Sequence, residues 1–303
     1  MFAKYKISTS EILTSLLLKP VDQIVEFPDY KEWEEQQYAA FSGDILNPMI
    51  YGNDGVIKAE VLSNEQFPIQ PKHVFISHSS KDATVAKCFA YYLSRLGIDC
   101  FIDSMIWNNI SQLQRVLDEK YCWLNEEEKI FNYKKRNNST AHVHAILSTA
   151  LFEMIDQCEC AIFLESDNSV VKLEDIKDDS TYSPWIYEEI NYISKIRQNI
   201  PERLKHIYTR YFSARDDRIN ESVENLVVVY PMKAVKELTP LTAKNIECMG
   251  NFTKLLKEEG VTGISGEDVL EMLYVQTGYI FRYDDCNLIN KYERFLKENC
   301  AES

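Results

Sequence analysis

The chain has 303 residues and a net charge of −14, and 45% of its residues are hydrophobic. Such a hydrophobic content excludes disorder as the main state, because a chain this apolar can bury a sizeable core. The acidic balance argues against a surface built to neutralise phosphates, so we expect no nucleic-acid partner.

The sequence predicts neither a secretory signal nor a membrane span. The first residues lack the charged-then-apolar layout of a signal peptide. No run approaches the ~18 apolar residues that a spanning helix needs. We therefore expect a cytoplasmic protein with no membrane partner, whose eight cysteines are free thiols rather than disulfides.

Residues 1–71 are interpreted as a partly helical N-terminal appendage. Ser8 and Glu11 stand three residues apart, as in a capping box that starts a short helix, and Pro20 ends that helix. The aromatic and acidic stretch that follows has no clean period and no recognisable chemical motif.

The core domain is expected to span residues 72–235. Val74–Ile76 is an apolar run typical of a buried parallel strand, and a polar loop follows it from Ser77. The next apolar residues recur on one helical face as far as Gly97, which suits the left-handed position after a helix. Ile98–Asp103 is the next expected strand, so this unit predicts a right-handed parallel crossover.

Residues 104–141 form an unusually long connection with a helix-like segment between Ile110 and Leu117. Connections in α/β domains are normally ~2–6 residues outside the helix itself. We interpret this insertion as a cover over a functional site, a partner surface, or a solvated helical insertion.

Strong periodicity returns after the insertion. Apolar residues recur every three or four positions from Val143 to Ile155, and Cys160–Leu164 is a continuous apolar run. These patterns predict a helix and the third strand of the sheet. Ser183 and Pro184 suit the N-cap and first position of another helix, which is expected to run to about Arg197.

The remaining predictions concern the second half of the chain. Leu226–Tyr230 is expected to be a further buried strand, whereas His206–Phe212 fits a strand or a helix. Residues 236–303 are interpreted as a helical C-terminal appendage, with a helix start bracketed by Ser265 and Asp268.

Two short groups of metal-ligating residue types occur in the chain. One comprises Cys158, Glu159 and Cys160, and the other comprises His142 and His144. Neither completes the four-ligand spacing of a structural metal site, so we expect no metal.

Two stretches resemble the Toll/interleukin-1 receptor (TIR) domain family. Phe75–His78, followed by Ser79, Lys81 and Asp82, is similar to the first strand and loop of that family, and Gly97–Asp103 is similar to its second strand. Trp185–Glu189 matches the tryptophan-x-x-x-glutamate pattern of the members that consume NAD+. The resemblance covers roughly residues 72–235, about half the chain.

The resemblance implies an α/β fold with a flavodoxin-like parallel sheet. The insertion at 104–141 departs from typical receptor and adaptor members. The layout looks most like the bacterial TIR proteins of Thoeris-type antiphage defence, which make a nucleotide signal from NAD+. The resemblance also implies a homo-oligomer or an activation-dependent assembly, with a downstream effector that senses the product.

Trp185 and Glu189 are four residues apart on the expected helix, so they share a face. An indole beside a carboxylate suits a cationic ring such as nicotinamide, or a ribose that becomes cationic as its leaving group departs. Without the resemblance, Trp185 in the core and Glu189 in solvent is the plainer interpretation. Glu188 is the competing carboxylate, about 100° away around the helix, and the family spacing selects Glu189.

The family's substrate-binding positions map onto four further residues. Phe75 and Ser77 lie at the carboxyl end of the first expected core strand, the edge where ligands bind in open parallel sheets. Phe75 would stack on a ring or simply fill the core, and Ser77 would touch ribose or phosphate. Asp103 and Ser104 enter the loop over the expected pocket. His78 is a candidate base, or a residue that caps the following helix.

The expected function is therefore cleavage of the nicotinamide–ribose bond of NAD+, with a linear or cyclic ADP-ribose-type product. No glycine-rich dinucleotide fingerprint is present, so NAD+ would be a substrate, and we expect no cofactor. Two alternatives stay open. One is a non-catalytic TIR interaction or scaffold module, and the other is a nucleoside ribosyl-transferring enzyme.

Overall fold

The computed structural model describes residues 1–17, 19–40, 57–66, 72–105, 107–127, 129–172, 179–205, 230–280 and 287–299. The chain divides into two units. Unit 1 comprises Met1–Ile24, Lys72–Phe101 and Cys158–Ser303, and unit 2 comprises Val25–Pro71 and Ile102–Gln157. The predicted insertion therefore falls in a unit that also contains part of the predicted N-terminal appendage.

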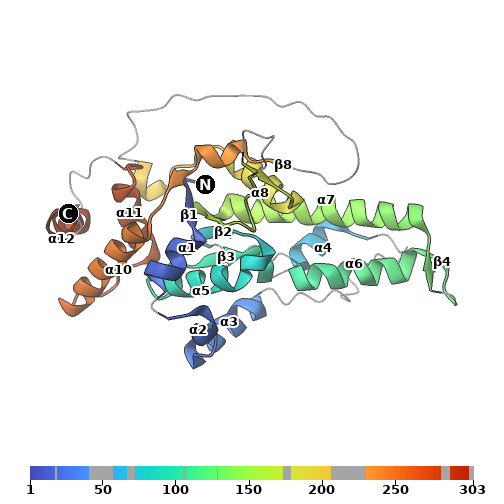
Figure 1. The fold of residues 1–303 in the computed structure, drawn as a ribbon, viewed down its shortest axis with the longest axis horizontal. Helices are drawn as coiled ribbons and strands as arrows, with labels where there is room; N and C mark the ends of the chain where they lie inside the picture. The colour runs from blue at the N-terminus through green and yellow to red at the C-terminus, as the bar shows by residue number, and fades with distance from the viewer. Residues whose placement is uncertain are drawn as a thin grey trace. The chain divides into compact units, whose positions relative to one another are not determined.

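A five-stranded parallel sheet with flanking helices makes this an α/β fold. The strand order is β3-β2-β6-β1-β9. The strands are β1 (Ala3–Ser8), β2 (Val74–Ser77), β3 (Cys100–Ile102), β6 (Cys160–Glu165) and β9 (Thr239–Pro240). Helices α5 (Ala83–Ser94) and α8 (Pro184–Lys195) lie on opposite faces of this sheet (Figure 1).

Strand β1 corrects the prediction that residues 1–71 are an appendage. It pairs in parallel with β6 over six residues, from Ala3 opposite Cys160 to Ser8 opposite Glu165, and its other edge pairs with β9. Ala3, Tyr5 and Ile7 are buried and alternate with half-buried residues. The sequence signal was therefore a period of two, which the helix-capping pattern at Ser8 obscured.

The helix after β1 begins where it was expected, but the predicted capping box is wrong. Ser8 accepts a hydrogen bond from the amide of Ser10, and Glu11 Oε2 accepts from the amide of Ala243 at 2.9 Å. Glu11 thus binds the first turn of a distant helix instead of its own. A carboxylate is favoured there because the first amides of a helix lack intrahelical acceptors.

The other described elements of unit 1 are helical apart from one small antiparallel pair, β7 with β8. Their bounds are β7 (Ser180–Thr181), β8 (Tyr230–Pro231), α1 (Thr9–Glu11), a π-helical turn (Ile12–Leu16), α2 (Val21–Ile24), η3 (Ser80–Asp82), η5 (Glu202–Leu204), η6 (Lys233–Glu237), α10 (Ala243–Glu258), α11 (Gly266–Gln276) and α12 (Asn287–Asn299). The three last helices confirm that the C-terminal region is helical.

Local capping signals in unit 1 agree with the structure. Gly97 has φ of +86°, as a helix-ending glycine should. Ser265 and Asp268 cap α11 reciprocally. Gly266, next to this cap, approaches the carbonyl oxygen of Gly97 so closely that an added Cβ would lie 2.2 Å from that oxygen. Helix α11 therefore packs directly on the turn between α5 and β3.

A charged cluster ties this C-terminal region to the start of β6. Arg203 donates to both oxygens of Glu159 at 2.6 and 2.7 Å and to Glu271 at 2.7 Å. Tyr274 also donates to Glu159, at 2.7 Å. Burial acts to lower the pKa of Arg203, but the bonds to the two carboxylates outweigh it and raise that pKa. The guanidinium is therefore a permanent cation that joins three segments.

Unit 2 contains the helices α3 (Pro28–Ala40), α4 (Ala59–Gln66), α6 (Trp107–Tyr121) and α7 (Tyr133–Gln157), the turn η4 (Asp103–Met105) and the strands β4 (Trp123–Asn125) and β5 (Ile130–Phe131). Helices α6 and α7 pack together, and the β4–β5 hairpin joins them (Figure 1). Arg136 on α7 binds the buried Asp118 on α6 at 3.1 Å. The helix that was predicted to begin at Val143 starts ten residues earlier, at Tyr133. Its first turn is capped by Asn132, whose side chain accepts from the amide of Lys135.

Two predicted segments, one a strand or a helix and the other a strand, fall wholly or mainly outside the described residues. These are His206–Phe212 and residues 226–229 of the expected strand at Leu226–Tyr230. Tyr230, its last residue, belongs to β8, which pairs with β7 rather than with the main sheet. In the described ranges, no helix is long and apolar enough to cross a bilayer.

Five described cysteines are free thiols, as expected: Cys88, Cys100, Cys122, Cys158 and Cys160. Cys248 is disulfide-bonded, which contradicts the expectation for that residue.

The role of β1 gives a stability prediction. Ile7→Ala removes a side chain that is 2% exposed, whereas Leu13→Ala truncates one that is 43% exposed. We expect the first change to lower the free energy of unfolding by about 2–5 kcal/mol and the second by at most about 0.5 kcal/mol. Urea unfolding followed by circular dichroism measures both. Equal effects would mean that β1 does not contribute to the core.

Candidate functional site

The carboxyl ends of adjacent parallel strands bring loops together that are far apart in sequence. Strand β2 ends at Ser77 and its neighbour β6 ends at Glu165. The loops that follow these strands therefore meet at one edge of the sheet. The sequence analysis predicts that a ligand binds at this edge.

Helix α8 carries Glu189 and is fixed at both ends. Ser183 accepts a hydrogen bond from the amide of Ile186, and Pro184 occupies the first turn, as predicted. At the other end, Lys4 Nζ donates to the carbonyl oxygens of Ser194 and Ile196 at 3.2 and 3.0 Å. A cation suits the C-terminal end of a helix, whose last carbonyls lack intrahelical donors.

Burial is the main influence on Lys4 and lowers its pKa, while Glu237 acts to raise it. Lys4 lies on β1, in a segment that the sequence analysis assigned to an appendage. Its contribution to α8 was therefore missed. The contact could be seen only in the tertiary structure, because nothing near Lys4 in the sequence indicates an acceptor 190 residues away.

Ser77 and Glu189 meet directly. Ser77 Oγ donates to Glu189 Oε2 at 2.6 Å. Their exposed fractions are 0% and 1%, so both lie out of contact with solvent. The plainer interpretation, with Glu189 in solvent, is therefore wrong. Glu188, the competing carboxylate, is half-buried.

The two aromatic candidates differ in accessibility. Trp185 is half-buried at the start of α8, one turn before Glu189. Phe75 is 0% exposed, and its ring packs against Phe101 with 5.6 Å between centroids. Phe75 therefore fills the core, one of the two roles weighed for it. A second pair of rings covers part of α8, because Tyr187 stacks on Tyr230 at 4.7 Å.

The remaining candidates from the sequence are Asp103, Ser104 and His78. Asp103 and Ser104 belong to unit 2, and their contact with substrate stays a prediction. His78 is buried, and its Nδ1 donates to the carbonyl oxygen of Ile76 at 3.3 Å. Ser79, not His78, caps the following turn by accepting from the amide of Lys81. The interpretation of His78 as a cap is therefore wrong.

A second carboxylate at this edge was not singled out from the sequence. Asp82 accepts from Ser166 Oγ at 2.5 Å and from Asn168 Nδ2 at 2.8 Å. These bonds join the loop after β2 to the loop after β6. The pairing of β2 with β6 was the only signal that could have predicted this contact, and it becomes visible only when the strand order is known.

The described residues contain no group of three or more histidine, cysteine or acidic side chains that could hold a metal ion. The thiols before β6 are also poor ligands. Burial raises the pKa of Cys158 to about 12 and holds that of Cys160 well above its usual range. Both thiols are therefore protonated at neutral pH, whereas a metal ligand or nucleophile must be a thiolate.

The arrangement offers one oriented carboxylate in a site that excludes water. Such a carboxylate stabilises positive charge more strongly than one in solvent, because the local dielectric is low. The described part of the site offers neither a paired acid for proton transfer nor an activated nucleophile. The chemistry that suits it forms a cation next to Glu189.

Comparisons of this chain with family models, curated proteins and solved structures found no match.

The Ser77–Glu189 bond predicts an energetic coupling. We expect Ser77→Ala alone to lower the free energy of unfolding by about 1–3 kcal/mol, because a buried carboxylate loses a donor. Combined with Glu189→Gln, the two effects should deviate from additivity by about 0.5–3 kcal/mol. Guanidinium unfolding of the two single variants and the double variant measures this coupling.

Glu188→Gln is the matched control, because it makes the same chemical change one residue away. Together with Ser77→Ala it should be additive to within about 0.5 kcal/mol. The same coupling at both glutamates would contradict a specific bond to Glu189.

Proposed function

We propose that this chain is a TIR-domain enzyme that cleaves the nicotinamide–ribose bond of NAD+ and makes a linear or cyclic ADP-ribose-type signal in antiphage immunity. The observation that carries the proposal is the buried bond between Ser77 and Glu189. These two residues belong to separate motifs, and each motif resembles the family through its amino-acid sequence alone. Contact between two such motifs, 112 residues apart, is a consequence that chance matches would rarely produce.

The strand order gives partial support. Counted from β2, the strands β3-β2-β6 follow the 2-1-3 order of a flavodoxin-like sheet. The fourth place is taken by β1, which precedes all of them in the chain. The proposed relationship therefore requires that an N-terminal strand replaces the fourth strand of the family fold.

In the proposed reaction, the bond between the nicotinamide nitrogen and the ribose carbon breaks, and its electron pair leaves with nicotinamide. The leaving group departs neutral, so no general acid is required. Glu189 stabilises the oxocarbenium-like ribose, and Ser77 positions that carboxylate. The indole of Trp185 packs against the nicotinamide ring. Water then adds to give ADP-ribose, or an atom of the same molecule adds to give a ring, and a proton is released.

The burial of Glu189 adds a condition to this proposal. A carboxylate that is 1% exposed cannot touch a substrate until the elements around α8 separate. Strands β7 and β8 and the turn η6 pack on α8. We therefore treat the described conformation as a resting state, and opening of this layer as part of activation.

The same burial favours one alternative, a non-catalytic interaction or scaffold module. A buried serine–glutamate bond stabilises a fold whether or not it takes part in a reaction. Under this alternative the Ser77–Glu189 pair only holds α8 on β2. A nucleoside ribosyl-transferring enzyme is the third possibility, because one oriented carboxylate would serve it equally well.

Nicotinamide release from NAD+ tests the proposal. We expect Glu189→Ala to lower kcat by about 10²–10³-fold, because it removes the one preorganised electrostatic group. Glu188→Ala, the neighbouring change on the same helix, should stay near wild type. The products are identified by mass spectrometry under two conditions. In one the full chain is incubated alone, and in the other it is added to a lysate of phage-infected cells, which supplies a trigger.

Each other outcome identifies a competing interpretation. Equal activity of wild type and Glu189→Ala would remove Glu189 from the site. Absence of nicotinamide release under every condition would favour the scaffold. Cleavage of nucleosides but not of NAD+ would favour the ribosyl-transferring enzyme.

A further inference from the structure

Unit 2 contains a cavity of about 510 Å³ between helices α4, α6 and α7. This volume lies within the range of about 300–1,000 Å³ that is typical of small-molecule sites. All of its described lining residues belong to unit 2. It is therefore separate from the Ser77–Glu189 pair, and it does not depend on the proposed enzymatic function.

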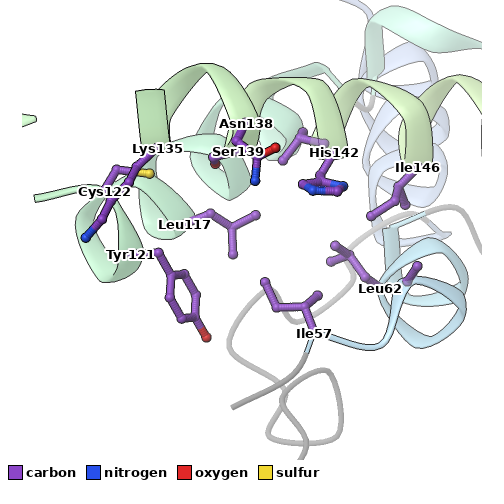
Figure 2. A pocket seen from close by; sticks show the side chains of 12 residues that line it. Ile57, Leu62, Leu117, Tyr121, Cys122, Lys135, Asn138, Ser139, His142 and Ile146 are labelled. Carbon is purple, nitrogen blue, oxygen red and sulfur yellow. The ribbon is translucent and has the colours of Figure 1, made fainter. Parts of the chain in front are cut away.

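The cavity has one polar end and one aliphatic end (Figure 2). Lys135 and Tyr121 lie at the polar end, whereas Leu62 and Ile146 lie at the aliphatic end. Leu117 forms part of the apolar wall between them. A ligand that fills such a space has a polar head and an elongated apolar body.

The polar residues of α7 are arranged along one face of the helix. Lys135, Asn138 and His142 are spaced three and four residues apart, so all three line the same cavity. Asn138 and His142 make no side-chain hydrogen bond to any described residue. Their donors and acceptors are therefore available to a ligand along its length.

The charge of the lining differs from that of the chain. Although the net charge of the chain is −14, none of the twelve described lining residues is acidic. Lys135 forms no ion pair with a described residue, whereas its neighbour Arg136 is paired with Asp118. Burial is the main cause that raises the pKa of Cys122, so this lining thiol is protonated and does not offset the lysine. The lining therefore carries positive charge at one end.

We propose that this cavity binds a small amphipathic anion, with its acidic group at Lys135 and its apolar body along Leu117 towards Ile146. The class comprises aromatic or aliphatic acids with a single negative charge. A polyanion such as a nucleotide fits less well, because the described lining includes one lysine and is mostly apolar. Unit 2 is in this view a ligand-binding module in its own right.

Two fluorescent probes that differ by one charge test the proposal. They are 8-anilinonaphthalene-1-sulfonate, which carries one sulfonate, and N-phenyl-1-naphthylamine, which is neutral and has the same ring system. The full chain is titrated with each probe at low salt, where an exposed charge is least screened. We expect saturable one-to-one binding of the sulfonate and about two- to fivefold weaker binding of the neutral probe.

Two matched pairs of variants locate the site on α7. Lys135→Gln should weaken binding of the sulfonate about two- to fivefold and leave the neutral probe unchanged, whereas Lys134→Gln should affect neither. Asn138→Phe should fill the cavity and abolish binding of both probes, whereas Asn137→Phe, about 100° away around the helix, should not. Thermal melts followed by circular dichroism confirm that all four variants are folded.

Several results would overturn the proposal. Absence of saturable binding would show that the cavity holds no ligand of this class. Equal affinity of the two probes, or equal effects of Lys134→Gln and Lys135→Gln, would remove the charge preference. Undiminished binding in folded Asn138→Phe would place the probe elsewhere on the chain.

Discussion

The parallel pairing of β1 with β6 is the interaction on which the other features of unit 1 depend. It runs for six residues and places the N-terminal strand inside the sheet, between β6 and β9. The same strand supplies Lys4, which binds the last carbonyls of α8, the helix that carries Glu189. A segment at one end of the chain thus holds both the sheet and the helix of the candidate site. Its hydrogen bonds are non-local, so they form only when distant parts of the chain come together.

The buried carboxylate of Glu189 imposes the main physical constraint on function. Removing a carboxylate from water is unfavourable unless hydrogen bonds compensate, and Ser77 supplies one of them. The result is a preorganised group that is strong in a water-free site but inaccessible in the described conformation. A carboxylate in this position either stabilises the fold alone or acts after a layer over α8 has moved. Whether a substrate can reach the carboxylate of Glu189 therefore distinguishes the proposed enzyme from the scaffold module.

Unit 2 differs from unit 1 in that its main feature is a cavity between helices. Its helices α6 and α7 are joined by a charged contact between the buried Asp118 and Arg136, and they leave an elongated cavity whose polarity changes from end to end. A long connection in an α/β chain is commonly functional. Here the connection folds into helices that line an open cavity in unit 2. The two units therefore offer two distinct chemistries, an oriented carboxylate in one and, in the other, a pocket whose described lining residues include no acid.

The sequence by itself determined the elements whose signals are local. The apolar strands around Phe75 and Cys160, the cap at Ser183 and the capping box at Ser265 all follow from short-range patterns. Only the tertiary structure decided the contacts between distant segments. The place of β1 in the sheet, the partners of Glu11 and Lys4, and the loop contacts of Asp82 rest on long-range hydrogen bonds. No local pattern encodes such bonds, because their acceptors or donors lie 84 to 232 residues away.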